Sequence, residues 1–316
     1  MFVKQEAVLS SQIEGTQASL SDIIEAEAQL VDKGRPSDVK EVSNYISAIN
    51  EGVEKLAEWP VSTRLITHLH RILMNDVRGQ DQTPGEFRRS QNWIGPAGCS
   101  LNDAIFVPPP YSEIDRALGQ LENFLNNQDD VPFLIRAGLV HAQFETIHPF
   151  LDGNGRMGRM LITLMMVERK ILSLPILYLS YFFKQHRVEY YGRLQAVRED
   201  GDWENWLIFF LNGVTAVARL ATETARNVVA LREEHRQKII DGFDRSAAMP
   251  LRLLDRLYGL PIIDVNMTTE YLDTSFPTAN KIIARFVEIG ILTELTGQRR
   301  NRVYYYHAYL RQFEEI

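Results

Sequence analysis

The stretch His148-Pro149-Phe150-Leu151-Asp152-Gly153-Asn154-Gly155-Arg156-Met157-Gly158-Arg159 holds a candidate base, a carboxylate, three glycines and two arginines. Glycines let backbone N–H groups approach a ligand closely, and the start of a following helix adds partial positive charge. Arginine side chains add paired donors for the same anion. The segment is therefore predicted to bind phosphate.

Two predicted helices flank this segment. Residues 132–147 carry apolar side chains at helical spacing, and residues 160–167 are apolar enough to predict a buried helix. A dinucleotide-binding fold would instead need a strand before the glycines. A zinc site formed by His141, Glu145 and His148 is the weaker alternative, because the arrangement H-E-x-x-H is absent and Glu145 is as readily a solvated residue.

Composition predicts a folded globular protein with room for two domains, since the 316 residues are 45% hydrophobic and 10% aromatic. A net charge of −7 argues against a surface coated with basic charge, although a local basic patch stays open. Cys99 is the single cysteine, which excludes an intramolecular disulfide. With no leader pattern and no apolar run of spanning length in the sequence, we expect a cytoplasmic protein that does not enter a membrane.

Helical periodicity covers most of the chain and predicts the all-α class. Further helices are expected near 6–30, 42–56, 65–73, 179–197 and 203–231, the first of these broken near Gly15 and resumed after a cap at Ser19. Two short β-like runs, 91–94 and 104–107, predict a β-hairpin. From about residue 245, helices followed by a basic loop between β-like segments suggest a winged helix.

At residues 148–159 the chain resembles the Fic family, whose motif H-x-F-x-D/E-G-N-G-R-x-x-R it matches at every defined position. Family members have a helical core with a β-hairpin flap, and typical ones transfer AMP from ATP to a hydroxyl side chain of a target protein. The resemblance implies a protein adenylyltransferase that releases pyrophosphate. It also implies an N-terminal inhibitory helix region at 1–35, a Fic catalytic domain at 36–244 and a winged helix-turn-helix domain at 245–316.

The same resemblance implies a role for each motif residue. His148 would be the general base that deprotonates a Ser, Thr or Tyr hydroxyl, a task suited to a group that titrates near neutrality. Asp152 would hold Mg²⁺, and Arg159 would bind the γ-phosphate. The residues implied to bind ATP are Gly153, Asn154, Gly155, Arg156, Met157, Gly158, Arg159, Tyr190 and Tyr191. For Tyr190 and Tyr191, which would stack on adenine, an ordinary core role stays equally open.

Near the N-terminus, Ser10-Ser11-Gln12-Ile13-Glu14-Gly15 fits the pattern Ser/Thr-x-x-x-Glu-Gly/Asn of self-inhibited Fic proteins. In those proteins the glutamate reaches the arginine matched here by Arg159 and takes the place of the γ-phosphate. A carboxylate and a phosphate would then compete for one guanidinium, so inhibition is a population balance. The alternative is that Glu14 pairs with a surface cation or ends a helix. Because the pattern begins at Ser10, whether Met1 is the native start stays open.

The partners are less well defined by the sequence. The hairpin would align the target by strand pairing, which carries little side-chain information and leaves the target unidentified. The C-terminal module would bind DNA, or serve as a protein-interaction or homodimer module. The residues that would face DNA are Thr278, Asn280, Lys281, Arg285, Arg299, Arg300 and Arg302. The alternative functions are a nucleotide-sensing DNA-binding regulator, or a Fic enzyme that removes AMP or transfers another phosphate-containing group.

Overall fold

A computed structural model describes the chain except for residues 29–36, 96–97, 128–129, 244–245, 299 and 315–316. The chain forms two compact units. The larger unit comprises Phe2–Ala18 and Pro36–Arg219, and the second comprises Met1, Ser19–Arg35 and Leu220–Ile316. The predicted domain boundaries at 35/36 and 244/245 lie outside the described residues, so the division into 1–35, 36–244 and 245–316 stays a prediction.

The larger unit is helical, as predicted. Its helices are α1 (Phe2–Ile13), α3 (Ser37–Lys55), α4 (Thr63–Leu73), α5 (Ile114–Asn126), α6 (Phe133–Ile147), α7 (Asn154–Glu168), α8 (Ser180–Gln185), α9 (Arg187–Asp200), the first part of α10 (Trp203–Phe243), and the short 3₁₀ turns η1 (Leu101–Asp103) and η2 (Tyr111–Glu113). The helices expected in the first part of 6–30 and near 42–56, 65–73, 132–147 and 179–197 are confirmed. Helix α5 was not predicted.

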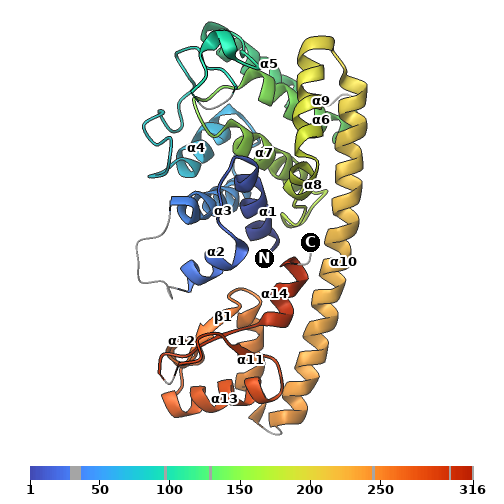
Figure 1. The fold of residues 1–316 in the computed structure, drawn as a ribbon. Coiled ribbons are helices and arrows are strands. Elements are labelled where there is room, and N and C mark those ends of the chain that lie inside the picture. Colours follow the sequence, from blue (N-terminus) through green and yellow to red (C-terminus); the bar gives the residue numbers. More distant parts are fainter. Residues whose placement is uncertain (29–36, 96–97, 128–129, 244–245, 299, 315–316) are drawn as a thin grey trace. The chain divides into compact units, whose positions relative to one another are not determined.

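Helix α7 lies at the centre of this unit and packs against α1, α3, α4 and α6 (Figure 1). Its side chains from Met160 to Met166 are buried on every face, as the strongly apolar sequence predicts. Burying one such Leu or Met side chain contributes about 2 kcal/mol relative to leaving it exposed. The start of α7, which carries the glycine-rich motif, is therefore held by the best-packed element of the unit.

The predicted hairpin at residues 91–107, called the flap segment below, is less regular than expected. Its described residues hold one antiparallel bridge, with Ile94 N–H donating to Phe106 O at 2.8 Å and Phe106 N–H donating to Ile94 O at 3.1 Å. The 3₁₀ turn η1 lies between the bridged residues. Three prolines follow at 108–110 and remove the N–H donors that a longer ladder would need.

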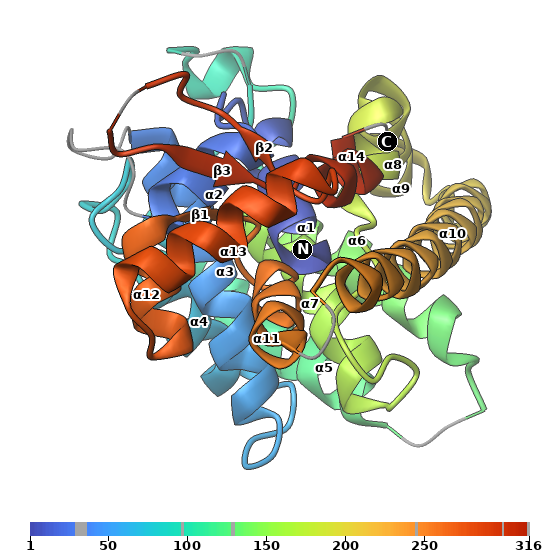
Figure 2. The same ribbon diagram turned by 90° about the horizontal axis from the view of Figure 1, so that it is seen from below.

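The second unit contains a small three-stranded sheet and several helices. These elements are α2 (Leu20–Glu27), the remainder of α10, α11 (Ala248–Leu257), β1 (Ile262–Asp264), α12 (Val265–Leu272), α13 (Phe276–Glu288), β2 (Thr293–Glu294), β3 (Val303–Tyr305) and α14 (His307–Glu314). The antiparallel order is β1-β3-β2, in which Tyr304 pairs with Ile263 on one side and Glu294 on the other. Figure 2 shows α12 and α13 packed together in this unit.

Local sequence explains several boundaries of the second unit. Ser19 caps α2 as predicted, since its hydroxyl accepts from Asp22 N–H at 3.2 Å and the Asp22 carboxylate accepts from Ser19 N–H. Asp264 caps α12 by accepting from Met267 N–H at 2.7 Å. The winged-helix assignment stays a prediction, and Arg299 of the expected wing lies outside the described residues. No helix in the described part of either unit combines the length and the apolar character needed to cross a membrane.

Candidate functional site

The glycine-rich motif forms a tight turn between α6 and α7, called the motif turn below (residues 148–153). Helix α6 ends at His148 in the left-handed conformation (φ 48°, ψ 61°), and Gly153 precedes α7 with φ 77°. The Asn154 side chain closes the turn: its Oδ1 accepts from Phe150 N–H, and its Nδ2 donates to Phe150 O, both at 2.8 Å. The turn therefore presents the first N–H groups of α7, which have no partners within the helix, as donors for an anion.

His70 on α4 packs against the motif turn and binds its backbone. Its ring stacks on Phe150 with centroids 3.6 Å apart and planes within 3°. Nδ1 accepts from Gly85 N–H at 2.9 Å, so the proton is on Nε2, which donates to the Asp152 carbonyl at 2.9 Å. Burial lowers the pKa of His70 to about 4, which keeps the ring neutral at pH 7. Sequence reasoning missed His70, whose only signal was a histidine on the apolar face of a predicted helix.

His148 is half-buried, and its Nδ1 lies 3.4 Å from the Glu145 carbonyl oxygen. Burial is the main cause that lowers the pKa of His148 to about 4, and the charge of Arg198 acts in the same direction. This pKa lies below the near-neutral range expected for the general base, so the ring is neutral at pH 7. A neutral imidazole at pH 7 is nevertheless free to accept a proton.

Arg159 on α7 is bound by residues of α1 and the turn that follows it. Its Nη2 donates to Glu14 Oε1 at 2.6 Å and to Ser10 O at 3.0 Å, and its Nε donates to Ser10 Oγ at 2.9 Å. The Arg159 side chain is 1% exposed and that of Glu14 33%. Burial raises the pKa of Glu14, but the Arg159 guanidinium outweighs this effect and the pKa is lowered. The pairing expected for Glu14 is thus present, and its partner is a buried arginine rather than a surface cation.

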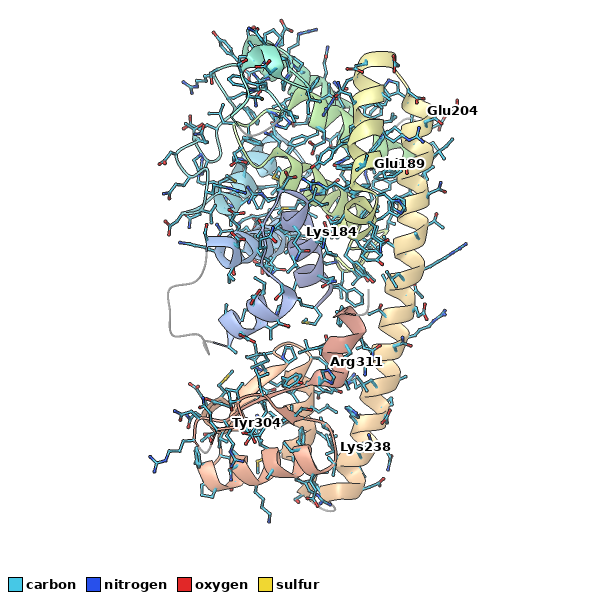
Figure 3. All side chains as sticks on the ribbon, in the orientation of Figure 1. Lys184, Glu189, Glu204, Lys238, Tyr304 and Arg311 are labelled. Carbon is cyan, nitrogen blue, oxygen red and sulfur yellow. The ribbon has the colours of Figure 1, made fainter. Side chains whose placement is uncertain are left out.

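Helix α1 is held against the body of the unit along its length. The Glu6 carboxylate accepts from Ser180 N–H at 3.0 Å, from the Ser180 hydroxyl, and from Tyr45 OH at 3.4 Å. Nearer the C-terminal end of α1, Lys184 of α8, labelled in Figure 3, donates to Gln12 Oε1 at 2.6 Å. The position of Glu14 is therefore set by the docking of a whole helix.

Arg156 lies beneath the motif turn and is 2% exposed. Its Nη1 is 3.6 Å from Glu41 Oε2, and its Nη2 is 3.8 Å from Asp152 Oδ1. Within the described residues, neither its Nε nor its Nη1 has a hydrogen-bond partner. A buried guanidinium with unsatisfied N–H groups is costly, so Arg156 retains capacity to bind an anion.

Asp152 is the one carboxylate within the motif turn, and its side chain is 40% exposed. Its Oδ1 accepts from Gly153 N–H at 2.6 Å. In the described parts of the chain, no group of three or more His, Cys, Asp or Glu side chains is arranged to hold a metal ion. A single exposed carboxylate fits Mg²⁺, which usually keeps several waters and takes phosphate oxygens from its substrate.

Two family models match this chain, one described as Fic/DOC family over residues 60–166 and the other as Fic/DOC family N-terminal over residues 1–54. The first includes the whole motif turn, and the second includes Ser10 and Glu14. The chain belongs to the Fic/DOC family.

Protein adenylyltransferases from other organisms match part of this Fic protein in sequence. A probable protein adenylyltransferase of Aquifex aeolicus is 30% identical over 115 residues, which are 34% of this chain and 33% of the relative. The protein adenylyltransferase Fic of Aedes aegypti is 30% identical over 141 residues, 44% of this chain and 25% of the relative. The matched segments thus span a third or less of the relatives' lengths.

Solved structures show the same Fic fold. A Fic family protein from Desulfovibrio desulfuricans matches with a TM-score of 0.62 at 22% identity, covering 96% of this chain and 86% of that one. Fic-1 from C. elegans matches with a TM-score of 0.51 at 22% identity, covering 66% of this chain and 59% of that one. At these identities the likeness concerns the fold alone.

The remaining residues of the Fic site divide between core and surface. Tyr190 is 1% exposed and its OH lies 2.8 Å from His141 Nε2, so its ring serves the core. Tyr191 is 40% exposed, and it alone of the expected adenine pair has an accessible face.

His141 Nδ1 lies 3.1 Å from Gly158 O, so both ring nitrogens have partners and the zinc alternative is wrong. Met157 is fully buried, which leaves only its backbone for a ligand.

Close packing gives a second reason, besides backbone flexibility, why positions 155 and 158 of the motif are glycines. A Cβ on Gly155 would collide with Glu14 Oε1, and a Cβ on Gly158 would collide with Glu145 Oε1. The alternative that Glu145 is a solvated residue is wrong, because Glu145 is 6% exposed and burial raises its pKa to about 7. The absence of side chains at these glycines therefore leaves room for the carboxylate groups of Glu14 and Glu145 beside α7.

Proposed function

We propose that this protein is an adenylyltransferase that moves AMP from ATP to a Ser, Thr or Tyr hydroxyl of a target protein and of itself. The observation that carries the proposal is the motif turn itself, which presents His148, the partly exposed Asp152 and the N-terminus of α7 within one short stretch of backbone. The names of the Aquifex and Aedes relatives support the same reaction class.

In this mechanism His148 accepts the proton as the target hydroxyl oxygen attacks the α-phosphorus of ATP. The bond from that phosphorus to the bridging oxygen breaks, and pyrophosphate leaves with its electron pair. The N–H groups of Gly153, Asn154 and Gly155 would stabilise the charge on the phosphate oxygens, together with Arg156 and Arg159. Mg²⁺ held by Asp152 would neutralise phosphate charge when bound.

We further propose that Glu14 restrains this activity. The γ-phosphate of ATP and the Glu14 carboxylate would compete for Arg159, whose Nη2 now donates to Glu14 Oε1. The apparent affinity for ATP in the productive pose is proportional to the fraction of molecules in which Arg159 is released, so pairing with Glu14 lowers that affinity. Partial exposure of Glu14 supports this proposal, because a side chain at the edge of the core can leave without unfolding α1.

Radiolabel transfer from α-³²P-ATP with Mg²⁺ tests the proposal, with self-labelling as the readout. We expect little label in the wild type, more in Glu14→Gly, and none in the double variant Glu14→Gly/His148→Ala. Comparison with γ-³²P-ATP separates AMP transfer from phosphate transfer, and loss of label from pre-labelled protein detects AMP removal. If the Glu14→Gly protein binds ATP but takes up no α-label, transfer of AMP to the protein itself is excluded. If added candidate target proteins also stay unlabelled, the result favours a nucleotide sensor.

The second unit supports a separate proposal, that α12, α13 and the β2–β3 loop form a winged-helix module that binds DNA. Lys281 on α13 is exposed, as are Arg300 and Arg302 in the loop. Arg285 is less available than expected, because it donates to Gly242 O at 3.2 Å and pairs with Glu288 at 2.6 Å. Titration with duplex DNA at several salt concentrations checks the proposal, and a flat salt dependence would favour protein docking instead.

A further inference from the structure

Arg88 is buried, at 2% exposure, between the motif turn and the flap segment. Its guanidinium donates to backbone carbonyls at the motif turn and at residues that flank the flap segment. Nε donates to His148 O at 3.0 Å, Nη1 donates to Ser90 O at 3.1 Å, and Nη2 donates to Pro109 O at 2.6 Å and to Ile147 O at 3.4 Å. One planar group therefore joins the end of α6 to the residues that precede and follow the flap segment.

The backbone of Arg88 strengthens the same connection. Its N–H donates to Pro149 O at 2.9 Å, so main chain and side chain both bind the segment around His148. Burial lowers the pKa of the guanidinium, and bonds to carbonyl oxygens replace the water that it loses. Lysine could not reproduce this arrangement, because its single ammonium lacks a planar fork of five donors.

Asn92 makes a second connection. Its Nδ2 donates to Phe150 O at 2.9 Å, an oxygen that also accepts from Asn154 Nδ2 at 2.8 Å. Gln91 Nε2 donates to Pro108 O at 2.9 Å and so ties the first residue of the flap segment to the residue that follows its end. The flap segment is thus fixed to the motif turn through the side chain of Asn92, near its beginning, and that of Arg88, which precedes it.

These contacts matter because the flap segment has little structure of its own. Within its described residues it has a single bridge, and Ile105 and Trp93 are 63% and 41% exposed. Its apolar side chains therefore contribute little to its placement. Additional support comes from α9, where the Arg198 guanidinium lies 3.9 Å from the Phe106 ring centroid and Gln195 Nε2 donates to Ile105 O at 3.3 Å.

We propose that Arg88 and Asn92 are positioning residues that hold the flap segment in register with His148, so that a target hydroxyl aligned by the flap reaches the base. The inference rests on the proposed adenylyl transfer. A displacement of about 1 Å in a reacting group lowers a rate by about 100-fold, which sets the scale of the expected effect. Arg88 contacts backbone oxygens of residues 147–149 and not the N–H groups of residues 153–155 that we propose bind the phosphates, so we expect ATP binding to change little when Arg88 is replaced.

Transfer kinetics in a Glu14→Gly background test this role with Arg88→Met, Arg88→Lys and Asn92→Ala. We expect kcat to fall by about 10- to 100-fold in Arg88→Met, less in Arg88→Lys and Asn92→Ala, with KM for ATP within about twofold. The matched control is Arg89→Met, since the neighbouring Arg89 side chain is 88% exposed. A rise in KM for ATP at unchanged kcat would overturn the proposal.

Amide hydrogen exchange provides a readout that does not need activity. Peptides covering residues 90–95 and 104–109 should exchange faster in Arg88→Met and Asn92→Ala, while peptides from α3 keep the exchange of the parent. If the Glu14→Gly parent transfers no AMP, the proposed function is wrong. The hydrogen-exchange measurement then still tests whether Arg88 and Asn92 position the flap segment. If Arg88→Met does not fold, Arg88→Lys and Asn92→Ala carry the test, and unchanged flap exchange in both would refute it.

Discussion

The Glu14 carboxylate and the Arg159 guanidinium meet at 2.6 Å although 145 positions separate them in the sequence. Ser10 completes the contact with two more bonds to the same guanidinium. The pair joins the turn that follows α1 to α7. Arg159 is therefore satisfied from within the chain, and a ligand must replace these bonds to use it.

Glu14→Gly should lower the stability of the ligand-free protein and increase the stabilisation by ATP. Removal of the carboxylate leaves a buried guanidinium without its counter-charge, which we expect to cost about 1–3 kcal/mol because partial exposure weakens the pair. Thermal unfolding with and without magnesium ATP measures both effects. Glu58→Gly, at an exposed carboxylate, is the control. Equal ATP-induced shifts in wild type and Glu14→Gly would contradict the competition.

Ser10→Ala should weaken the restraint less than Glu14→Gly does. The substitution removes the bond from Arg159 Nε but keeps the one to the Ser10 carbonyl, at an expected cost of about 1 kcal/mol. Self-labelling should therefore rank Glu14→Gly above Ser10→Ala and Ser10→Ala above wild type. The neighbouring Ser11 is a matched control, since its buried Oγ has no hydrogen-bond partner among the described residues. Equal labelling by Ser10→Ala and Ser11→Ala would exclude a role for the hydroxyl.

His70→Phe should destabilise the motif turn although it preserves a ring against Phe150. The variant leaves the Asp152 carbonyl and the Gly85 N–H without their buried partners, at an expected cost of about 2–4 kcal/mol. His70→Gln restores a donor near the Nε2 position and should recover part of the loss. Urea unfolding measures the difference, with His68→Phe on the same helix as control. Equal losses in His70→Phe and His70→Gln would show that the hydrogen bond to Asp152 contributes nothing.

The sequence predicted the elements whose causes are local. The apolar run after Met160, the glycines and Pro149 define α6, the motif turn and α7 within a single stretch. The pairing of Glu14 with Arg159 came from the family pattern, because no local signal joins residues so far apart. The flap segment was predicted as a β-hairpin from β-like side chains, yet its described residues hold one bridge, because the prolines at 108–110 lack the N–H donors of a longer ladder.

Arg88, Asn92 and His70 escaped prediction for a shared physical reason. Their partners are mainly backbone groups, which every residue carries, so no side-chain pattern records the pairing. Tertiary packing alone brings those groups together. The burial of Tyr190 illustrates the same limit, because stacking on a ligand and packing in the core require the same kind of side chain.

Glu6 should make the stability of the protein depend on pH. Burial raises the pKa of its carboxyl from 4.5 to about 7, against the hydrogen bonds from Ser180 and the charge of Arg159. Between these two pH values the folded protein holds a proton that the unfolded chain has released. The contribution of Glu6 to the free energy of unfolding therefore falls as pH rises from about 4.5 to 7.

Glu6→Gln isolates this effect, because the amide resembles the protonated carboxyl. The free energy of unfolding of Glu6→Gln minus that of wild type should rise between pH 5 and pH 8, by at most about 3 kcal/mol. The buried histidines and Glu145 titrate in both proteins, so their effects cancel in the difference. Urea unfolding at several pH values measures it, with Glu54→Gln on the exposed face of α3 as control. A difference that stays constant with pH would show that Glu6 is ionised throughout, and that α1 is held by a carboxylate rather than by a proton-sensitive contact.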